Sequence, residues 1–203
     1  MKLFHSPASP YVRKVMIAAW ERGVQERIEL LASAAGPVVR DMNIVAVNSS
    51  GKVPCAIIEG DQPLFDSRVI TQYVDSLAAS DGSIYPADRR FEILTLEALG
   101  DGILDACLLC RYETVMRPEP LRWQDWFDGQ MAKIDSGLDD LEGKWFSSLS
   151  TGSMHAGDIA VACVLGYLDF RFADKDWRQD HPRLAAWFEA VSRRRSMIET
   201  FPR

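Results

Sequence analysis

The sequence lacks the features that would assign it to several broad classes of protein. No apolar run approaches the roughly 18 residues that a membrane-spanning helix needs, and there is no internal repeat or low-complexity segment. Positive charge is not in excess either, because 23 Lys and Arg stand against 29 Asp and Glu, a formal net charge of −6. An acidic chain is a poor match for nucleic acid. We therefore expect no nucleic-acid partner and no membrane association.

Cysteine and histidine are scarce, with four and three residues in a chain of 203. Cys107 and Cys110 have C-x-x-C spacing, but they stand inside a helical pattern without a second ligand pair or a nearby histidine. Core packing is therefore expected there, and neither zinc nor any other metal. Met1-Lys2 leads directly into the first strand pattern, so we expect no secretory leader. All the cysteines stand in apolar surroundings, which favours reduced thiols and a cytoplasmic location.

The first third of the chain alternates between strand and helix patterns. Residues 2–5 are typical of a short strand, and further strand patterns cover residues 25–31, 53–58 and 64–65. Helices are predicted to begin at Ser9-Pro10 and at Asp66-Ser67, with a weaker helical stretch over residues 38–45. This order predicts a small α/β sheet, with ligands bound where loops leave the ends of the strands.

The remainder of the chain is helical in pattern. Long helices are predicted over residues 89–115, 121–146, 158–172 and 183–195, and the segment 159–168 is apolar nearly all round, which is typical of a helix at the centre of a bundle. Glu97, Asp101 and Asp105 fall on one helix face and predict a solvated surface. The predicted division is an α/β domain over 1–78, a linker over 79–88 and an all-α domain over 89–203.

Three short motifs of the first domain each allow a structural and a functional interpretation. Ser9-Pro10 and Asp66-Ser67 can be helix caps and nothing more, or helix N-termini whose free amides hold an anionic ligand. Val53-Pro54 stands at the head of a strand, where proline requires an edge or a bend. A cis peptide bond there would turn the Val53 backbone toward an extended ligand, although trans is the commoner form.

In this order and at this spacing, the motifs resemble the N-terminal domain of cytosolic glutathione S-transferases. The matching segments are Ser9-Pro10-Tyr11-Val12-Arg13-Lys14, Gly51-Lys52-Val53-Pro54 and Phe65-Asp66-Ser67-Arg68-Val69-Ile70. The similarity spans essentially the whole chain, as in a small bacterial member of the family. It implies a thioredoxin-like domain with a cis-proline at Pro54, an all-helical second domain, a homodimer, glutathione as co-substrate and a role in detoxification.

The resemblance also implies roles for individual residues. Ser9 matches the position that activates the glutathione thiol, Val53 the residue whose backbone pairs with the cysteinyl part, and Asp66 and Ser67 the pair that holds the γ-glutamyl end. Lys52 lies beside them and is expected to meet the glycine carboxylate. The chemistry agrees for Ser9, since a helix N-terminus lowers a thiol pKa and a donated hydroxyl hydrogen bond stabilises a thiolate.

Serine at this turn excludes other chemistry. Ser6-Pro7-Ala8-Ser9 has the C-x-x-C spacing with both sulfurs absent, so no mixed disulfide with the protein can form there. Ser9 also lacks a His/Asp partner arranged to activate it, which argues against a hydrolytic triad. Thiolate stabilisation remains as the role expected for Ser9.

A small hydrophobic electrophile is the expected second substrate, and its pocket is expected to be lined by Tyr11, Arg111, Tyr112 and Met116. Conjugation, dehalogenation and peroxide reduction remain open. So does an alternative of another class, a non-catalytic regulatory protein of this fold like the stringent-starvation factors.

Two local departures from the family pattern accompany the resemblance. Asn48-Ser49-Ser50-Gly51 replaces the common Asn-Pro before the glycine, which we expect to affect the stiffness of the loop. His155 stands where the family has Ser or Thr in a capping box completed by Asp158. Whether the side chain at position 155 accepts its hydrogen bond in the box is therefore in question.

Overall fold

The computed structural model describes residues 1–79 and 82–202. The chain forms two compact units, the first made of Met1–Asp88 with Arg195–Arg203 and the second of Arg89–Arg194. Two residues of the predicted linker, 80 and 81, lie outside the described part. Within that part, no helix combines the length and the apolar character needed to cross a membrane.

The first unit is built on a small mixed sheet. Its strands are β1 (Lys2–His5), β2 (Glu29–Ala32), β3 (Cys55–Ile57) and β4 (Pro63–Leu64), in the order β2-β1-β3-β4. β1 is parallel to β2 and antiparallel to β3, and β4 is antiparallel to β3. A β-α-β unit is thus followed by a hairpin and a helix, as the sequence predicts.

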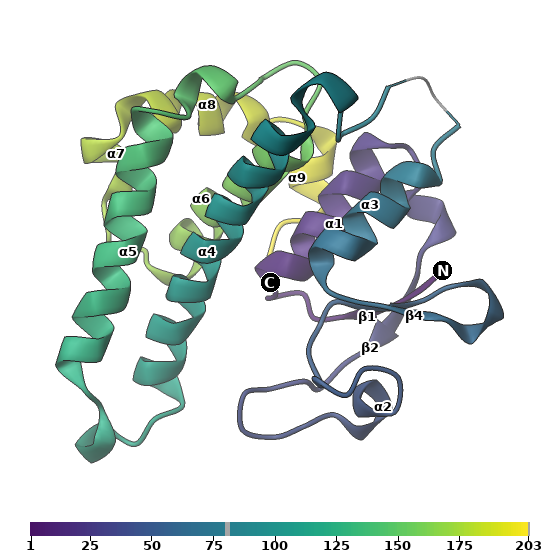
Figure 1. Cartoon of the computed structure of the whole chain (residues 1–203). Coiled ribbons are helices and arrows are strands. Elements are labelled where there is room, and N and C mark those ends of the chain that lie inside the picture. The colour runs from purple at the N-terminus through teal and green to yellow at the C-terminus, as the bar shows by residue number, and fades with distance from the viewer. Residues whose placement is uncertain (80–81, 203) are drawn as a thin grey trace. The chain divides into compact units, whose positions relative to one another are not determined.

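Helices cover both faces of this sheet (Figure 1). α1 (Pro10–Glu21) and α3 (Ser67–Ser76) lie together on one face, and the short α2 (Met42–Val45) lies on the other. Side chains alternate along a strand, so Phe4 points toward the α2 face and joins Ile44 and Cys55 in an apolar cluster. Short 3-10 turns cover Gln25–Arg27, Glu59–Asp61 and Ala87–Arg89.

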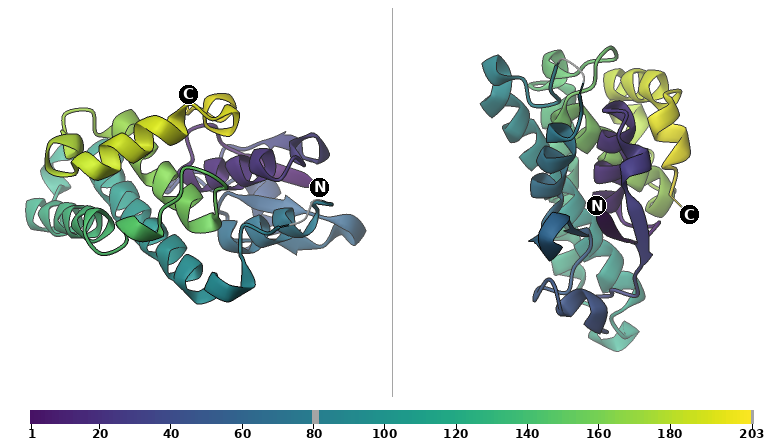
Figure 2. Two further views of the ribbon diagram at one scale, coloured as in Figure 1. Left: turned by 90° about the horizontal axis from the view of Figure 1, so that it is seen from above. Right: turned by 90° about the vertical axis from the view of Figure 1, so that its right-hand side faces the viewer.

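The final residues of the chain belong to the first unit. α9 (Arg195–Glu199) lies beside α1, as the views in Figure 2 also show. The Arg13 guanidinium donates to the Met197 carbonyl at 3.3 Å, and the Ser196 hydroxyl donates to Glu21. The predicted division places this segment in the helical domain, whereas these long-range contacts hold α9 against α1.

Two predicted elements of the first unit are shorter than expected. The strand expected over 25–31 begins only at Glu29, because residues 25–27 form a 3-10 turn. The helix expected over 38–45 is reduced to α2, which begins where the Asp41 carboxylate accepts from the Asn43 amide at 2.9 Å. Both boundaries are set by local hydrogen bonds that the hydrophobic pattern does not reveal.

The second unit is helical. It contains α4 (Arg90–Val115), α5 (Gln124–Glu142), α6 (Ala156–Arg171), α7 (Trp177–Asp180) and α8 (Pro182–Ser192), with 3-10 turns at Glu119–Leu121 and Phe146–Ser148. α6 is buried from Ala156 to Leu168, which confirms the central helix predicted from its apolar run. The expected solvated face of α4 is wrong for Glu97 and Asp101, which are 0% and 5% exposed, and confirmed only for Asp105, which is exposed.

Small residues let these helices approach closely. A Cβ atom on Gly100 of α4 would stand 2.9 Å from the Cβ of Ala160 on α6, and one on Gly157 of α6 would stand 2.8 Å from Leu96. Between α4 and α5, a Cβ atom on Gly137 would lie 2.5 Å from the Ile103 side chain. These contacts leave no space for a methyl group, so glycine is required by packing at these positions.

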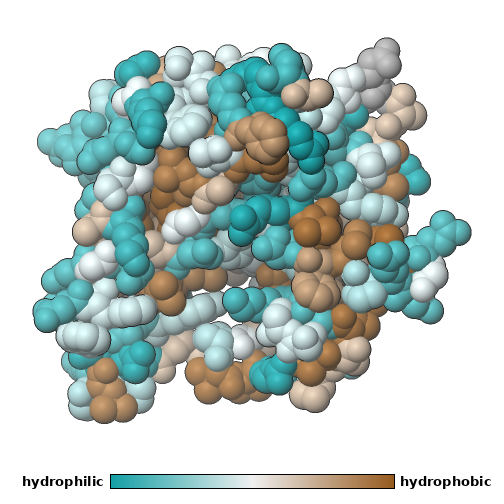
Figure 3. Space-filling model, viewed as in Figure 1, coloured by the Kyte–Doolittle hydropathy of each residue, from teal (hydrophilic) through white to brown (hydrophobic). Residues whose placement is uncertain are grey.

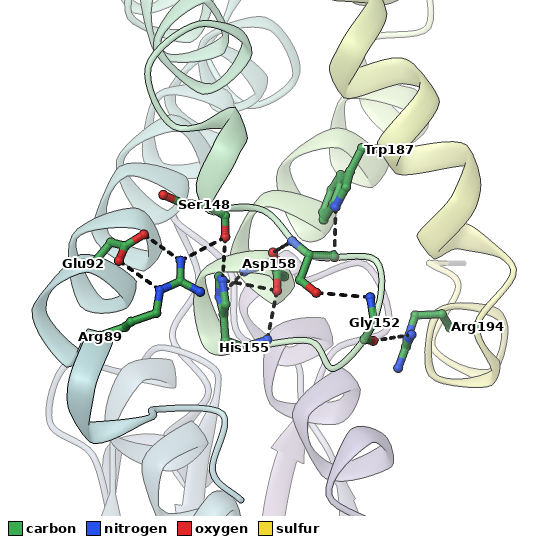
Figure 4. Close-up of polar contacts among 9 residues, drawn as sticks. Arg89, Glu92, Ser148, Gly152, His155, Asp158, Trp187 and Arg194 are labelled. Atoms are coloured by element: carbon green, nitrogen blue, oxygen red, sulfur yellow. Dashed lines mark hydrogen bonds and ion pairs between the residues drawn. The ribbon is translucent and has the colours of Figure 1, made fainter.

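A buried network fixes the start of α6 (Figure 4). Nδ1 of His155 accepts from the Asp158 amide at 3.1 Å, and the Asp158 carboxylate accepts from the His155 amide at 2.9 Å. The capping box is therefore complete with histidine in place of the hydroxyl residue. Nε2 of His155 lies 2.9 Å from the Ser148 carbonyl, which identifies the neutral tautomer that carries its hydrogen on Nε2.

Two carboxyl groups of this network have shifted pKa values. Burial raises the pKa of Asp158 to about 6, against the opposing effect of hydrogen bonds from the backbone amides of His155 and Ser150. Hydrogen bonds from Arg89 lower the pKa of Glu92 to about 2, helped by a hydrogen bond with Ser148. The network thereby joins the loop before α6 to the first turn of α4.

Candidate active site

Ser9 caps α1 at the end of the loop that follows β1. Its backbone is extended (φ −81°, ψ 120°), and its Oγ accepts from the Val12 amide at 3.3 Å. Pro10 occupies the first turn, where a missing amide hydrogen costs nothing. Because Oγ only accepts in this contact, the hydroxyl hydrogen remains available to a ligand.

The loop before β3 is shaped by Asn48, a residue that the sequence analysis did not single out as part of the site. Asn48 is 1% exposed, and its side chain donates to the Lys52 carbonyl at 3.2 Å while accepting from the Ser50 amide at 3.0 Å. Gly51 adopts a left-handed conformation (φ +66°) that other L-residues rarely take. The sequence contains a signal for this loop, namely an asparagine three residues before a glycine.

The peptide bond between Val53 and Pro54 is cis, as the family resemblance implied. Pro54 is buried, whereas Val53 is partly exposed and precedes the first residue of β3. Within the described residues, the Val53 backbone forms no hydrogen bond with a neighbouring strand. Its amide and carbonyl are therefore available to an extended ligand.

Asp66 caps α3 in the same way that Ser9 caps α1. Its Oδ1 accepts from the Arg68 amide at 3.0 Å, and its carboxylate is exposed. Ser67 is the first residue of α3 and is 2% exposed; its hydroxyl has no hydrogen-bond partner among the described residues. The peptide bond between Phe65 and Asp66 is also cis.

The sheet topology brings the three motifs to one edge. Phe4 pairs with Cys55, so the end of β1 lies beside the start of β3. Ala56 pairs with Leu64, so the end of β4 lies at this edge as well. The N-termini of α1 and α3 follow directly, and each presents the positive end of a helix dipole. The result is an edge suited to an extended anionic ligand.

The residues predicted for the electrophile pocket lie in both units. Tyr11 is in the first turn of α1, Arg111 and Tyr112 lie near the end of α4, and Met116 caps that helix. Burial raises the pKa of the Tyr112 phenol. Because the set is divided between the two units, the pocket stays a prediction.

The cysteines contribute to the core. All four are buried, and desolvation raises the pKa of Cys107 to about 12 and of Cys110 to about 11. Core packing of the C-x-x-C pair is thus confirmed, because thiols with such pKa values are not reactive at neutral pH. Over residues 1–79 and 82–202, no group of His, Cys, Asp and Glu is arranged to hold a metal ion.

Comparison with known proteins agrees with this architecture. Models of the glutathione S-transferase N-terminal and C-terminal domains match residues 8–77 and 124–190. The chain is 34% identical over 206 residues to YibF of Escherichia coli K12, named an uncharacterized GST-like protein, covering 100% of this chain and 98% of that one. The chain belongs to the glutathione S-transferase family.

Solved glutathione transferase structures support the same conclusion. A family member from Pseudomonas fluorescens Pf-5 with bound glutathione is 45% identical, with a TM-score of 0.95 over 100% of this chain and 98% of that chain. A glutathione S-transferase from Methylobacillus flagellatus with bound glutathione is 31% identical, with a TM-score of 0.88 over 100% and 99% of the two chains.

Proposed function

We propose that the protein is a glutathione transferase that binds glutathione along the edge formed by Ser9, Val53-Pro54 and Asp66-Ser67. The observation that carries this proposal is the convergence of two capped helix N-termini and an unpaired strand backbone at one sheet edge. Relatives of 45% and 31% identity whose structures contain glutathione support it.

Each part of glutathione would meet a matching group. The Val53 amide and carbonyl would pair with the backbone of the cysteinyl residue. The amides at the start of α3, with the Ser67 hydroxyl, would hold the γ-glutamyl carboxylate, and Asp66 would accept from its ammonium group. Lys52 is exposed and would meet the glycine carboxylate. The thiol would then lie at the N-terminus of α1.

Ser9 would act as a hydrogen-bond donor to the thiolate. The thiol proton leaves to solvent, and the positive end of α1 and the Ser9 hydroxyl stabilise the sulfur anion. In conjugation, a sulfur lone pair forms a bond to the electrophilic carbon, and the leaving group departs with the electrons of the bond that breaks. Peroxide reduction would draw on the same thiolate.

The electrophile would contact Tyr11, Arg111, Tyr112 and Met116. One relative from Pseudomonas fluorescens Pf-5, 44% identical to this chain, has a structure with bound S-(propanoic acid)-glutathione. In that ligand the sulfur carries a short group with a carboxyl function. We further propose a homodimer acting in the cytoplasm in detoxification, and the buried thiols are consistent with a reducing compartment.

The ultraviolet absorbance of the glutathione thiolate, titrated on the protein, tests this proposal. We expect the bound thiol pKa to fall from about 8.5 to below about 7.5. Ser9→Ala should raise it by about 1–2 units, because a hydrogen bond to a charged group contributes roughly 1.5–3 kcal/mol. Ser9→Thr retains the hydroxyl and should preserve the shift, and Ser6→Ala is the control in the same turn.

Two outcomes would contradict the proposal. Glutathione that binds with an unshifted thiol pKa would favour the non-catalytic regulatory alternative. Failure of glutathione to bind would contradict both the proposed transferase and a non-catalytic protein that binds glutathione at this edge.

A further inference from the structure

The backbone of Asn48 anchors the loop between α2 and β3 to the core of the first unit. Its amide donates to the Ile44 carbonyl at 2.7 Å, and its carbonyl accepts from the Gly51 amide at 2.8 Å. Ile44 is 0% exposed and belongs to the apolar cluster that also contains Phe4 and Cys55. The position of Asn48 is therefore fixed through α2 by the packing of the sheet.

The side-chain amide of Asn48 can adopt only one orientation in this loop. Its Oδ1 accepts from the Ser50 amide at 3.0 Å and from the Ser50 hydroxyl at 2.7 Å, and its Nδ2 donates to the Lys52 carbonyl at 3.2 Å. A backbone amide only donates and a carbonyl only accepts, so exchanging Oδ1 and Nδ2 would lose the bonds to both backbone groups. Because Asn48 is 1% exposed, that exchange would leave buried polar groups unpaired.

The Lys52 carbonyl and the Val53 amide belong to one peptide group. The peptide bond between these two residues is trans. In a planar trans peptide group the C=O and the N–H point in opposite directions. Asn48 holds the C=O toward the buried side of the loop, so the N–H of Val53 points away from it. Val53 is accordingly partly exposed, and its amide has no hydrogen-bond partner among the described residues.

We propose that Asn48 is a positioning residue for glutathione, which turns the Val53 N–H toward the carbonyl of the cysteinyl residue without touching the ligand itself. The hydrogen bond to the Lys52 carbonyl sets this orientation before the ligand arrives. A donor that is already oriented loses little conformational freedom on binding, and this raises the affinity. The inference rests on the proposed function and adds to it the group that orients its central backbone contact.

Asn48→Asp tests this role by changing one group. At pH 8 the carboxylate still accepts from the Ser50 amide and hydroxyl, but it cannot donate to the Lys52 carbonyl and repels its oxygen. The peptide group is then free to turn. Calorimetric titration of the full chain with glutathione should show about tenfold weaker binding than in the wild type, which is the effect of one hydrogen bond.

The amide resonance of Val53 reports on the orientation directly. In the wild type, glutathione should move the Val53 amide proton downfield, because a new hydrogen bond forms there. In Asn48→Asp at saturating glutathione, the same proton should move much less. General damage to the loop would weaken binding but would not remove this shift from the saturated complex. A Val53 proton that does not respond to glutathione in the wild type would overturn the inference, even if the variant fails to fold.

Asn43→Asp is the matched control, because it makes the same substitution at an exposed position of α2. Its affinity for glutathione should stay within about twofold of the wild type. An equal loss in both variants would overturn the inference, since charge alone would explain it. So would a folded Asn48→Asp with wild-type affinity, while glutathione binding would still support the proposed function. Absence of glutathione binding by the wild type would overturn both.

Discussion

Replacement of His155 by alanine should destabilise the helical unit by about 3 kcal/mol. The ring makes two hydrogen bonds in a site where the side chain is 7% exposed. Nδ1 accepts from the Asp158 amide at 3.1 Å, and Nε2 donates to the Ser148 carbonyl at 2.9 Å. Loss of an N-cap costs about 1 kcal/mol, loss of the second bond about 1 kcal/mol, and the cavity adds a similar amount.

Serine at the same position separates these contributions. His155→Ser restores a good N-cap through a hydroxyl oxygen but cannot reach the Ser148 carbonyl, so a loss of about 1–2 kcal/mol is expected. Asp158→Ala removes the acceptor of two backbone amides, Ser150 and His155, each at 2.9 Å. Because buried donors left unpaired cost about 1–3 kcal/mol each, we expect it to cost at least as much as His155→Ala.

Equilibrium urea unfolding, followed by circular dichroism, gives the free energies of unfolding. The indole N–H of Trp187 donates to the Ser150 carbonyl at 3.0 Å, so its NMR resonance reports separately on the loop before α6 (Figure 4). Asp176→Ala is the control, since Asp176 stands at the N-cap of α7 without making a side-chain cap bond. It should change stability by less than about 0.5 kcal/mol.

The reasoning would be refuted if His155→Ala were within about 0.5 kcal/mol of the wild type, or if His155→Ser were as damaging as His155→Ala. The first result would mean that the histidine cap contributes nothing. The second would mean that packing of the ring, and not the cap, holds this end of α6. The ¹⁵N shifts of the imidazole supply an independent check, because the geometry requires a hydrogen on Nε2 and none on Nδ1.

Two further predictions concern α5 and the Arg89–Glu92 pair. Gly137→Ala should lower the free energy of unfolding in urea by about 1–3 kcal/mol, because its methyl group would overlap Ile103. The control is Gly129→Ala on the same helix, whose methyl group meets nothing within 4 Å and should stabilise the protein by up to about 1 kcal/mol. Equal effects of the two substitutions would refute the packing argument. Glu92 has a pKa lowered to about 2 from 4.5 by Arg89, so its contribution is present above pH 4.5 and is lost as pH falls toward 2. Both side chains are more than a third exposed, so solvent screening limits the contribution of the pair to the free energy of unfolding to about 1 kcal/mol. The difference in stability between the wild type and Glu92→Gln should therefore shrink from pH 7 to pH 3.

The sequence pattern does not predict which apolar side chains are exposed at the surface. On the face in Figure 3, hydrophobic residues are interspersed with hydrophilic ones. At the tip formed by the end of α4 and the start of α5, Leu121 is 66% and Trp123 62% exposed. Hydrophobicity alone would have assigned them to the core.

The sequence by itself determined the elements that carry strong local signals. Ser9-Pro10 and Asp66-Ser67 specify helix starts through side-chain oxygens that bond amides two or three residues away. The apolar run of α6 specifies a central helix because every face must be buried. The two helix caps of the proposed glutathione edge could be predicted for the same reason, since their hydrogen bonds are local.

Tertiary structure decided what depends on partners distant in the chain. The burial of Glu97 and Asp101 and the attachment of α9 to α1 both follow from helix packing. His155 completes the half of the capping box that the sequence left in question, because an imidazole nitrogen accepts a hydrogen bond from the Asp158 amide as a hydroxyl would. Spacing along one segment carries no information about the neighbour that a fold places beside it.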